Sequence, residues 1–433
     1  MFSNFCHVLK KLLFLNESIR FNTYLVCDFK PDTKMFFNGI RPKAEKCCGC
    51  EGCREICPKS AIKSTEDTDG FIIPEVNLDL CVECGLCEKV CPMSNADKIT
   101  SSTEGTAYAA VNKNGTELSQ SSSGGVFSLI ADYVLNKGGF ISGAAFDSTL
   151  NLCHIVTNHS DDMQNLRGSK YLQSRMENTY TDIKSILNTG KLVYFVGTGC
   201  QVAGLKLFLR KDYENLITSD ILCHGVPPQS VFNEMIKAVE SKYNGKIKKY
   251  SFRDKSVWGW SCSSSSNIEI RSKLKYLGNE PLQQAYFNAF IKADNYRESC
   301  YVCPYAQSRR AGDITLGDFW GVEKYIPIKD IRKGVSAILV NTPKGHQLIN
   351  KIKNNLNLFP ASIRDIEHIN RTLVEPTPRP AERELFFKKF KENPEMTLMT
   401  YYKPSMKRDF VYALKSNSVT AKMIILVKKV LKK

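Results

Sequence analysis

Two identical cysteine frames constrain this chain more than any other feature of its sequence. Residues 47–58 and residues 81–92 each read Cys-x2-Cys-x2-Cys-x3-Cys-Pro. Thiolates at this spacing wrap a loop around a [4Fe–4S] cluster, and the fourth cysteine of each frame binds the cluster of the other frame. The sequence therefore predicts two clusters. Their predicted ligands are Cys47, Cys50, Cys53 and Cys91 for one cluster, and Cys57, Cys81, Cys84 and Cys87 for the other.

A disulfide framework and zinc sites are the alternatives for these cysteines. Zinc sites use paired ligands rather than four in this rhythm, so clusters are favoured. Cys48 lies inside the first frame without interrupting it, and we interpret it as a bystander rather than a ligand. Because eight of the 17 cysteines fall in cluster frames, the expected location is a reducing cytoplasm.

The chain has 433 residues, which is too long for one core and predicts two or three domains. The sequence has no uninterrupted apolar run of about 18 residues, so it predicts no membrane span. Its first residues lack the basic start and the small-residue cleavage site of a secretory signal. The predicted parts are an extension over 1–43, a ferredoxin-type domain over 44–95, a catalytic body over 106–375 (divided into about 106–185 and 186–375), and a basic helical tail over 376–433.

Strand-like and helix-like segments alternate after residue 106. Apolar stretches at 140–146 and 191–197 predict strands, and residues 125–136 and 201–210 predict helices. The stretch 191–197 is continuously apolar, which is typical of a strand buried on both faces. The predicted fold class is therefore a small α+β ferredoxin domain followed by a larger α/β domain with a largely buried sheet.

The formal charge of +16 is spread unevenly. The ferredoxin-type region is acidic and the basic excess lies elsewhere, so we expect the two regions to attract each other. The sequence shows no zinc finger, RNA-binding aromatic signature or basic stripe, and we expect no nucleic-acid partner. Lysines alternate with Val, Ile and Leu near the C-terminus. Peripheral contact of this segment with an anionic membrane surface is one interpretation, and a solvated cap helix is the other.

Four further cysteines lie outside the two frames, at predicted strand ends and in a loop, where ligand-binding residues are often found. Cys200 follows a predicted buried strand and begins a helix, Cys223 ends the next strand, and Cys300 and Cys303 form a Cys-x2-Cys pair in a loop. A buried cysteine at a strand end is usually a small apolar residue, and a single Cys-x2-Cys pair also suits zinc or redox chemistry. Spacing alone does not bring the four together. Strand ends and loops do meet at the carboxyl edge of an open sheet, where such folds bind ligands.

Six short motifs add a resemblance to these observations. They occupy residues 121–125, 167–171, 197–201, 223–226, 300–305 and 313–321. With the two frames, they resemble the coenzyme F-420 hydrogenase/dehydrogenase beta-subunit family, in the version with an N-terminal two-[4Fe–4S] ferredoxin domain. The resemblance runs from about residue 46 to beyond residue 340. One departure is Gly199, where the family commonly has proline; glycine is expected to loosen the turn before Cys200.

The resemblance implies a flavin and a further cluster. Members of the family bind FAD and pass electrons between it and iron–sulfur clusters, so the larger domain is expected to be a flavin-binding α/β domain. The resemblance also implies a third [4Fe–4S] cluster beside the flavin. Its ligands would be Cys200, Cys223, Cys300 and Cys303. The 313–321 loop resembles a family loop near this cluster, and Trp320 is interpreted as a shield against water or as part of a packed turn.

Two loops are candidates for binding the FAD. Ser122, Ser123, Gly124 and Gly125 precede a predicted helix, where bare glycines allow close backbone approach and free amides favour phosphate. The alternative is an ordinary helix cap. Lys170 could neutralise a pyrophosphate or stabilise reduced flavin, with Tyr171 beside it; a solvated loop is the alternative. No G-x-G-x-x-G fingerprint supports a Rossmann site.

The expected function is an iron–sulfur flavoprotein oxidoreductase. Electrons would pass between the clusters and FAD, and to or from a hydride-accepting substrate that is a deazaflavin or another small molecule. Lys170 and His224 are the candidate catalytic residues, with His224 as a proton relay or a tuning group beside Cys223, or as a structural histidine. A redox protein or subunit is the expected electron partner. The alternative is a non-catalytic electron-transfer subunit of a larger redox complex.

Overall fold

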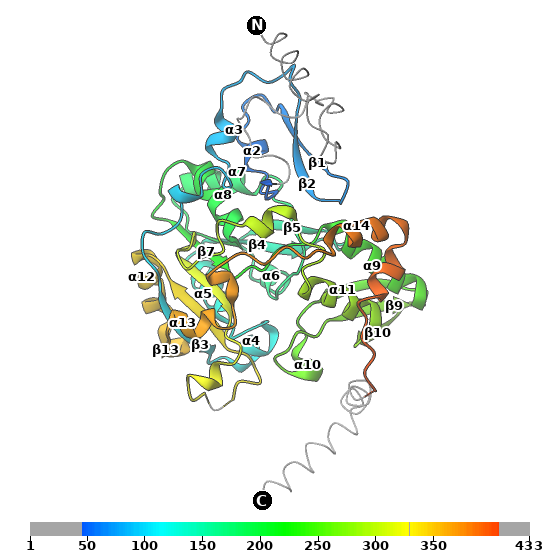
Figure 1. The fold of residues 1–433 in the computed structure, drawn as a ribbon. Helices are drawn as coiled ribbons and strands as arrows, with labels where there is room; N and C mark the ends of the chain where they lie inside the picture. The colour runs from blue at the N-terminus through cyan, green and yellow to red at the C-terminus, as the bar shows by residue number, and fades with distance from the viewer. Residues whose placement is uncertain (1–45, 329, 407–433) are drawn as a thin grey trace, which may run out of the picture. The chain divides into compact units, whose positions relative to one another are not determined.

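The N-terminal module forms a hairpin beside two short helices. The computed structural model describes residues 46–328 and 330–406, so the predicted extension and residues 407–433 of the predicted basic tail lie outside the described residues. Strands β1 (Ile62–Glu66) and β2 (Ile72–Val76) pair antiparallel, and each of the short helices α2 (Gly52–Glu55) and α3 (Leu86–Lys89) lies within one cysteine frame (Figure 1). Pro74 is tolerated in β2 because this sheet has two strands and both are edges.

The body is organised around an eight-stranded mixed sheet. Its central strands β4, β6, β7 and β11 run parallel, whereas β5, β12, β3 and β13 add antiparallel at the two sides. The predicted α/β alternation is therefore confirmed, within a mixed rather than an all-parallel sheet. In spatial order the strands are β13 (Leu356–Pro360), β3 (Thr106–Asn112), β12 (Ser336–Val340), β11 (Ile314–Asp318), β7 (Leu216–Ile221), β6 (Val193–Thr198), β4 (Phe140–Phe146) and β5 (Leu152–Thr157).

Helices cover both faces of this sheet. The alternation of side chains along β6 shows it, because Tyr194 packs with helices α5 (Val126–Leu135) and α12 (Pro343–Ile352) while Phe195 packs with α7 (Thr179–Asn188) and α8 (Gly199–Leu209). Both side chains are fully buried. The shorter helices α4 (Gly115–Gln120), α6 (Met163–Leu166), α10 (Lys255–Trp258) and α13 (Ile363–Glu367) belong to the connections.

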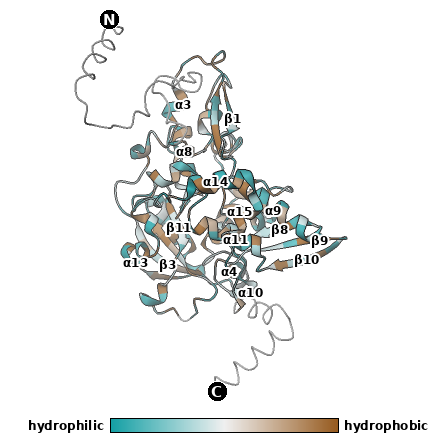
Figure 2. Ribbon diagram, turned by 45° about the vertical axis from the view of Figure 1, so that its right-hand side comes forward, coloured by the Kyte–Doolittle hydropathy of each residue, from teal (hydrophilic) through white to brown (hydrophobic). Residues whose placement is uncertain are grey.

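A second layer packs beside the large sheet. It contains the antiparallel strands β8 (Lys246–Ser251), β9 (Ser265–Ile270) and β10 (Lys273–Gly278), and the β9–β10 hairpin projects outward (Figure 2). Helices α9 (Gln229–Tyr243), α11 (Pro281–Ile291), α14 (Arg383–Glu392) and α15 (Pro394–Met399) share its apolar core. Residues 383–399, which the sequence assigned to a separate tail, therefore belong to this core. No helix in the described ranges is long and apolar enough to cross a membrane.

A buried arginine of the body holds the N-terminal module. Arg297 is 3% exposed, and its guanidinium donates to the carbonyls of Cys47 (3.0 Å) and Ile72 (2.7 Å) and to Oε1 of Gln173. Gln173 in turn donates through Nε2 to the carbonyls of Cys48 and Gly49, both at 3.1 Å. Gly49 has a φ of 64°, and a Cβ there would lie 2.2 Å from Nε2 of Gln173. Glycine is therefore required at this position.

Ion pairs of the expected sign supplement this attachment. Asp69 of the module pairs with Arg383 (3.3 Å) and Lys391 (2.9 Å), and Glu66 pairs with Arg175 at 2.9 Å. The pair between Glu66 and Arg175 is largely exposed, so we assign it well under about 1 kcal/mol. The buried hydrogen bonds of Arg297 are expected to stabilise the attachment more, because their acceptors would otherwise be unsatisfied.

Candidate functional site

The cysteines of the N-terminal module form two groups. Cys57 lines the same pocket as the first three cysteines of the second frame, Cys81, Cys84 and Cys87. Cys91 instead lies close enough to Cys47 and Cys50 for their charges to interact. This exchange of the fourth cysteine between the frames is the arrangement that the spacing predicts for two [4Fe–4S] clusters.

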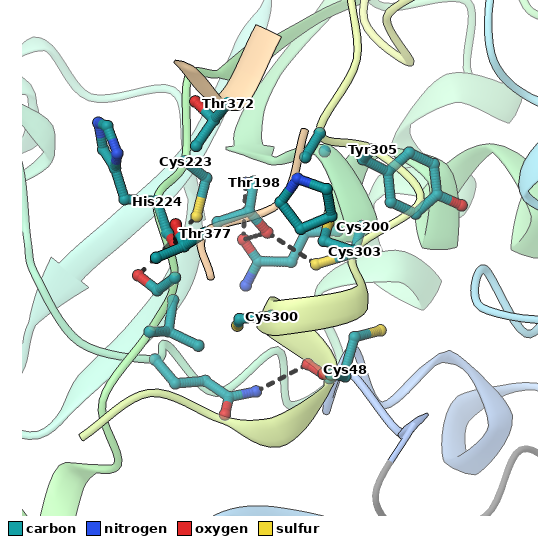
Figure 3. Close-up of a pocket in the computed structure, with 18 of the residues that line it drawn as sticks. Cys48, Thr198, Cys200, Cys223, His224, Cys300, Cys303, Tyr305, Thr372 and Thr377 are labelled. Carbon is teal, nitrogen blue, oxygen red and sulfur yellow. Dashed lines mark hydrogen bonds between the residues drawn. The ribbon is translucent and has the colours of Figure 1, made fainter. Parts of the chain in front are cut away.

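The body brings its own four cysteines to one pocket. Cys200 begins α8 directly after β6, and Cys223 follows β7, so the ends of two neighbouring parallel strands place them together. Cys300 lies in the short helix η4 (Glu298–Val302), and Cys303 follows it. All four line the pocket drawn in Figure 3. The carboxyl edge of the sheet therefore provides the convergence that sequence spacing alone did not show.

Cys48 lines the same pocket, which differs from its interpretation as a bystander. The backbone turns at Gly49, where φ is 64°, and Cys48 lines this pocket together with Cys200. Cys48 therefore stands between the first cysteine frame of the module and the cysteine pocket of the body. Sequence reasoning missed this placement, because it depends on the left-handed turn at Gly49 and on residues of the body that are distant in the sequence.

The donor set of this pocket suits a cluster better than a single ion. Within the described ranges, no group of three or more His, Cys, Asp or Glu side chains converges closely enough to hold one metal ion. Zinc needs its thiolates about 2.3 Å from one centre. A [4Fe–4S] cluster binds each thiolate to a different iron, so its ligands stand around a cavity. Four cysteines lining a pocket from three segments fit that requirement.

A buried ion pair fixes the segments that carry Cys223 and Cys303. Arg310 donates to the carbonyl of Tyr305 (2.6 Å) and to the carbonyl of Ile221 (3.1 Å), and it pairs with Asp220 at 3.3 Å. Both charged side chains are almost fully buried. The end of β7 and the loop after Cys303 are therefore held to the same guanidinium.

The turn before Cys200 is held in spite of Gly199. The backbone N–H of Thr198 donates to Oε1 of Gln201 at 2.9 Å and closes the start of α8. A Cβ on Gly199 would lie 2.9 Å from Cβ of Tyr305. The expectation that Gly199 loosens this turn is therefore not supported, because Gln201 fixes the turn and the glycine makes room for Tyr305.

A large cavity adjoins the cysteine pocket. Its volume is about 330 Å³, and its lining is mainly apolar. Both predicted flavin loops contribute to it, since Ser122, Ser123 and Gly125 line it together with Lys170 and Tyr171. The cavity and the cysteine pocket share a wall. The residues common to both linings are Leu172, Ser174, Thr198, Gln201, Cys223, His224, Gly225 and Val226.

The two predicted flavin loops are tied to each other. The backbone N–H of Ser169 donates to Oγ of Ser122 at 2.6 Å. Gly168, with a φ of 87°, supplies the turn that brings this amide to Ser122. Arg253 donates to the carbonyl of Ser122 at 3.3 Å from the other side. Loops that lie 47 residues apart in the sequence therefore form one rim of the cavity.

Gly124 differs from the other three members of its loop, because it faces the sheet instead of the cavity. A Cβ at this position would lie 2.2 Å from the carbonyl oxygen of Ala110 and 2.6 Å from the amide nitrogen of Ser336. Its own N–H donates to Oγ of Ser336. The glycine is therefore explained by the close approach of β3 and β12 rather than by a ligand.

This packing predicts a large effect of a small substitution. Gly124→Ala is expected to reduce the free energy of unfolding by about 3 kcal/mol, because strand backbone cannot move away from the added methyl group. Chemical denaturation measures the change. Gly115→Ala is the matched control, since a Cβ there meets open space at the start of α4, and it should shift the free energy by less than about 1 kcal/mol. Equal effects of the two substitutions would contradict the packing explanation.

The ammonium of Lys170 is bound by main-chain oxygens. It donates to the carbonyls of Asn165, Leu166 and Arg167, each at 2.9 Å, at the end of α6. Burial lowers the pKa of Lys170 to about 7. Tyr171 beside it accepts a hydrogen bond from Arg253 at 2.9 Å, and burial raises its pKa to about 12. Both residues line the cavity, but their polar groups hold the surrounding loops.

Arg253 was missed by sequence reasoning. Its side chain is 1% exposed, and it pairs with Asp318 at 2.7 Å. Trp260 donates to the same carboxylate and stacks on Trp320 with ring centroids 4.1 Å apart. Trp320 lines the large cavity, so it lies beside the candidate flavin site rather than over the cysteines. In the sequence, Arg253 resembled an ordinary charged strand residue, and no local pattern marked it.

His224 lies in the wall between the two pockets. Its ring points away from the cysteine side chains in Figure 3, and its backbone carbonyl accepts a hydrogen bond from Thr377 at 2.6 Å. The structure thus places the predicted proton relay beside the large cavity.

A buried hydrogen-bond chain, also missed from the sequence, runs through the same wall. The amide N–H of Thr198 can only donate, so it fixes Oε1 of Gln201 as the acceptor and Nε2 as the donor to Ser174 (2.9 Å). The Ser174 hydroxyl then donates to Nδ1 of His154 (2.9 Å), and Nε2–H of His154 donates to the carbonyl of Val196 (3.1 Å). This hydrogen-bond chain suits a neutral His154 whose ring proton is on Nε2.

His154 predicts a pH dependence of stability. Burial lowers its pKa to about 4 from an ordinary value of about 6.5. A group whose pKa is lowered by folding stabilises the protein above its unfolded pKa, and this contribution is lost as the pH falls toward the folded pKa. Lowering the pH from about 7.5 to about 5 should cost about 2 kcal/mol of unfolding free energy through this group. Urea midpoints at both values measure it.

His154→Gln is the variant that isolates this effect, because glutamine keeps an amide donor and does not titrate. It should remove about 2 kcal/mol from the stability difference between the two pH values. His346→Gln, at an exposed position on α12, is the control and should leave the difference unchanged. Full retention of the difference in the His154 variant would contradict the assignment.

Comparisons with known proteins find similarity in the N-terminal module and in part of the body. Residues 46–95 match a 4Fe-4S dicluster domain, and residues 190–364 match the family described as the C terminus of the coenzyme F420 hydrogenase/dehydrogenase beta subunit. An uncharacterized polyferredoxin-like protein of Methanocaldococcus jannaschii is 39% identical over 57 residues, which are 11% of this chain and 34% of that protein. A ferredoxin 7Fe of Hydrogenibacillus schlegelii is 42% identical over 52 residues, which are 12% of this chain and 60% of that protein.

The solved structures give a weaker likeness. A chain of the F420-reducing [NiFe] hydrogenase complex from Methanosarcina barkeri aligns over 67% of this chain and 91% of its own length, with 17% identity and a TM-score of 0.42. This chain spans between about a quarter and three fifths of the curated relatives that it matches. The resemblance seen in the sequence motifs is confirmed over these two ranges: residues 46–95 match a 4Fe-4S dicluster domain, and residues 190–364 match the C terminus of the coenzyme F420 hydrogenase/dehydrogenase beta subunit.

Proposed function

We propose that this chain is an iron–sulfur flavoprotein oxidoreductase. Electrons pass between the two N-terminal clusters and FAD through a third [4Fe–4S] cluster, and to or from a small molecule that accepts hydride. The ligands of the third cluster are Cys200, Cys223, Cys300 and Cys303. FAD exchanges single electrons with clusters and hydride with substrates, which is the chemistry that this arrangement requires.

The proposal rests mainly on one observation: the cysteine pocket and the large cavity share lining residues. Cys223 and Thr198 line both the cysteine pocket and the large cavity. On the other side, Cys48 links the cysteine pocket to the first cysteine frame. Three cysteine sites and one cavity therefore follow each other within the described part of the chain, in the order that electron transfer needs.

The residues around the cavity have distinct tasks in this proposal. Helix α5 begins directly after Gly125, and its first amides favour a phosphate group. Phe287 and Phe290 line the cavity and exclude water. Lys170 acts through its charge and by closing the loop, since three carbonyls already hold its ammonium. His224 relays a proton at the shared wall.

The electron partner is expected at the second frame. Cys84 is exposed, whereas Cys50 of the first frame is buried against the body. A Cβ on Gly204 of α8 would lie 3.3 Å from Sγ of Cys50, so α8 covers that side. A redox protein or subunit therefore reaches the clusters through the pocket of Cys57, Cys81, Cys84 and Cys87.

Anaerobic purification tests the proposal directly. The protein should contain about twelve iron atoms per chain, from three four-iron clusters, and should release one FAD per chain on denaturation. Cluster-replete protein without FAD would contradict the flavoprotein assignment and favour a non-catalytic electron-transfer subunit. An iron content of about eight would contradict the third cluster.

A further inference from the structure

The hydroxyl of Thr198 lies between two partners. Its Oγ1 is 3.1 Å from Sγ of Cys200 and 3.1 Å from Oε1 of Gln201. The same hydroxyl cannot donate to both at full strength, because it has a single proton. The partner that receives this proton depends on what Cys200 is bound to.

Gln201 does not need this proton. Its Oε1 already accepts the backbone N–H of Thr198 at 2.9 Å, and its Nε2 donates to Ser174. The chain that continues to His154 fixes the orientation of this amide from both ends. Rotating the Thr198 hydroxyl toward Cys200 therefore leaves no buried atom of Gln201 unsatisfied.

A thiolate bound to iron has no proton and only accepts hydrogen bonds. When Cys200 is a cluster ligand, its sulfur therefore favours the Thr198 proton, and charge-assisted hydrogen bonds are the stronger ones. Each reduction of a cluster adds negative charge to its sulfurs. A donor at 3.1 Å then stabilises the reduced cluster more than the oxidised one.

We propose that the Thr198 hydroxyl donates a hydrogen bond to the Cys200 thiolate and thereby raises the reduction potential of the third cluster. Thr198 would not bind the cluster itself but would adjust its reduction potential through the sulfur of Cys200. This proposal rests on the third cluster of the proposed function. The same side chain lines the large cavity. Thr198, which lies between the third cluster and FAD in this proposal, therefore adjusts the reduction potential of that cluster.

Thr198→Val tests the assignment, because valine keeps the shape and removes the donor. The midpoint potential of the third cluster, followed by EPR in a redox titration, should shift to a more negative value. Thr198→Ser should restore the wild-type value. In wild-type protein exchanged into heavy water, pulsed EPR should also detect an exchangeable deuteron near this cluster, and Thr198→Val should lose it.

Thr397→Val is the control. Thr397 is 6% exposed and lies outside both pocket linings, and its hydroxyl donates to the carbonyl of Asn393 at 2.8 Å. This substitution should leave the midpoint potential unchanged. A third-cluster signal with the wild-type potential in Thr198→Val would overturn the tuning role while leaving the proposed function intact. Absence of the signal from wild-type protein that contains about eight iron atoms would overturn the third cluster itself.

Discussion

Replacing Cys300 and Cys303 by serine should lower the iron content from about twelve to about eight atoms per chain. Both side chains line the cysteine pocket, and they contribute two of its four proposed ligands from one short segment. Two remaining thiolates on different strands are not expected to retain a cube. The clusters of residues 47–91 should stay, because their pockets use other cysteines. Iron analysis and EPR of the anaerobic protein measure the loss.

The consequence for electron flow separates this loss from general damage. With the third cluster absent, electrons supplied to the N-terminal clusters should reach FAD more slowly in rapid-mixing experiments. FAD itself should remain bound, since neither Cys300 nor Cys303 lines the large cavity. Cys153→Ala is the control, because Cys153 lies on β5 outside both linings, and it should keep about twelve iron atoms. An unchanged iron content in the double serine variant would contradict the ligand assignment.

Arg297→Met should destabilise the protein by about 3 kcal/mol and release the N-terminal module. The substitution removes the guanidinium that lies over the Phe71 ring and donates to the carbonyls of Cys47 and Ile72. Gln173 loses both hydrogen bonds to its Oε1 at the same time. Buried acceptors without a partner cost about 1–3 kcal/mol each, partly offset where water enters. Thermal unfolding of the cluster-loaded protein measures this change.

Arg175→Met, which breaks the exposed ion pair with Glu66, is the control for Arg297→Met. Arg175→Met removes an arginine that also joins the body to the module, but its pair with Glu66 is exposed on both sides. Its cost should stay below about 1 kcal/mol. Limited proteolysis should cut residues 96–105 faster in the Arg297 variant than in the Arg175 variant. Equal melting temperatures of the two variants would contradict the anchoring role of Arg297.

The parts of the site that follow from local spacing could be predicted from the sequence. The exchange of Cys57 and Cys91 between the frames follows from loop geometry over a few residues, and the structure groups Cys57 with the second frame. The strand predicted at 140–146 coincides with β4, and the helix predicted at 201–210 overlaps α8 for most of its length. Such features need no information from distant parts of the chain.

The remaining parts depend on contacts between distant residues. Arg297 lies 250 residues from Cys47, and Arg253 lies 65 residues from Asp318, so no sequence window contains either pair. The antiparallel additions at the side of the sheet depend on β3, which pairs with β12 and β13 from the far end of the body. Tertiary packing decides these pairings, while local periodicity identifies only the strands.

The attachment of the N-terminal module has an evolutionary consequence. Arg297 and Gln173 contact main-chain carbonyls of Cys47, Cys48, Gly49 and Ile72. These groups are present whatever side chains the module carries, so most substitutions that keep its backbone path leave the attachment intact. Gly49, Asp69 and Glu66 are exceptions, because a side chain at Gly49 would collide with Gln173 and the two carboxylates pair with basic side chains of the body. The module can therefore diverge in surface and redox properties, and adapt to a new electron partner, without matching changes in the body that holds it.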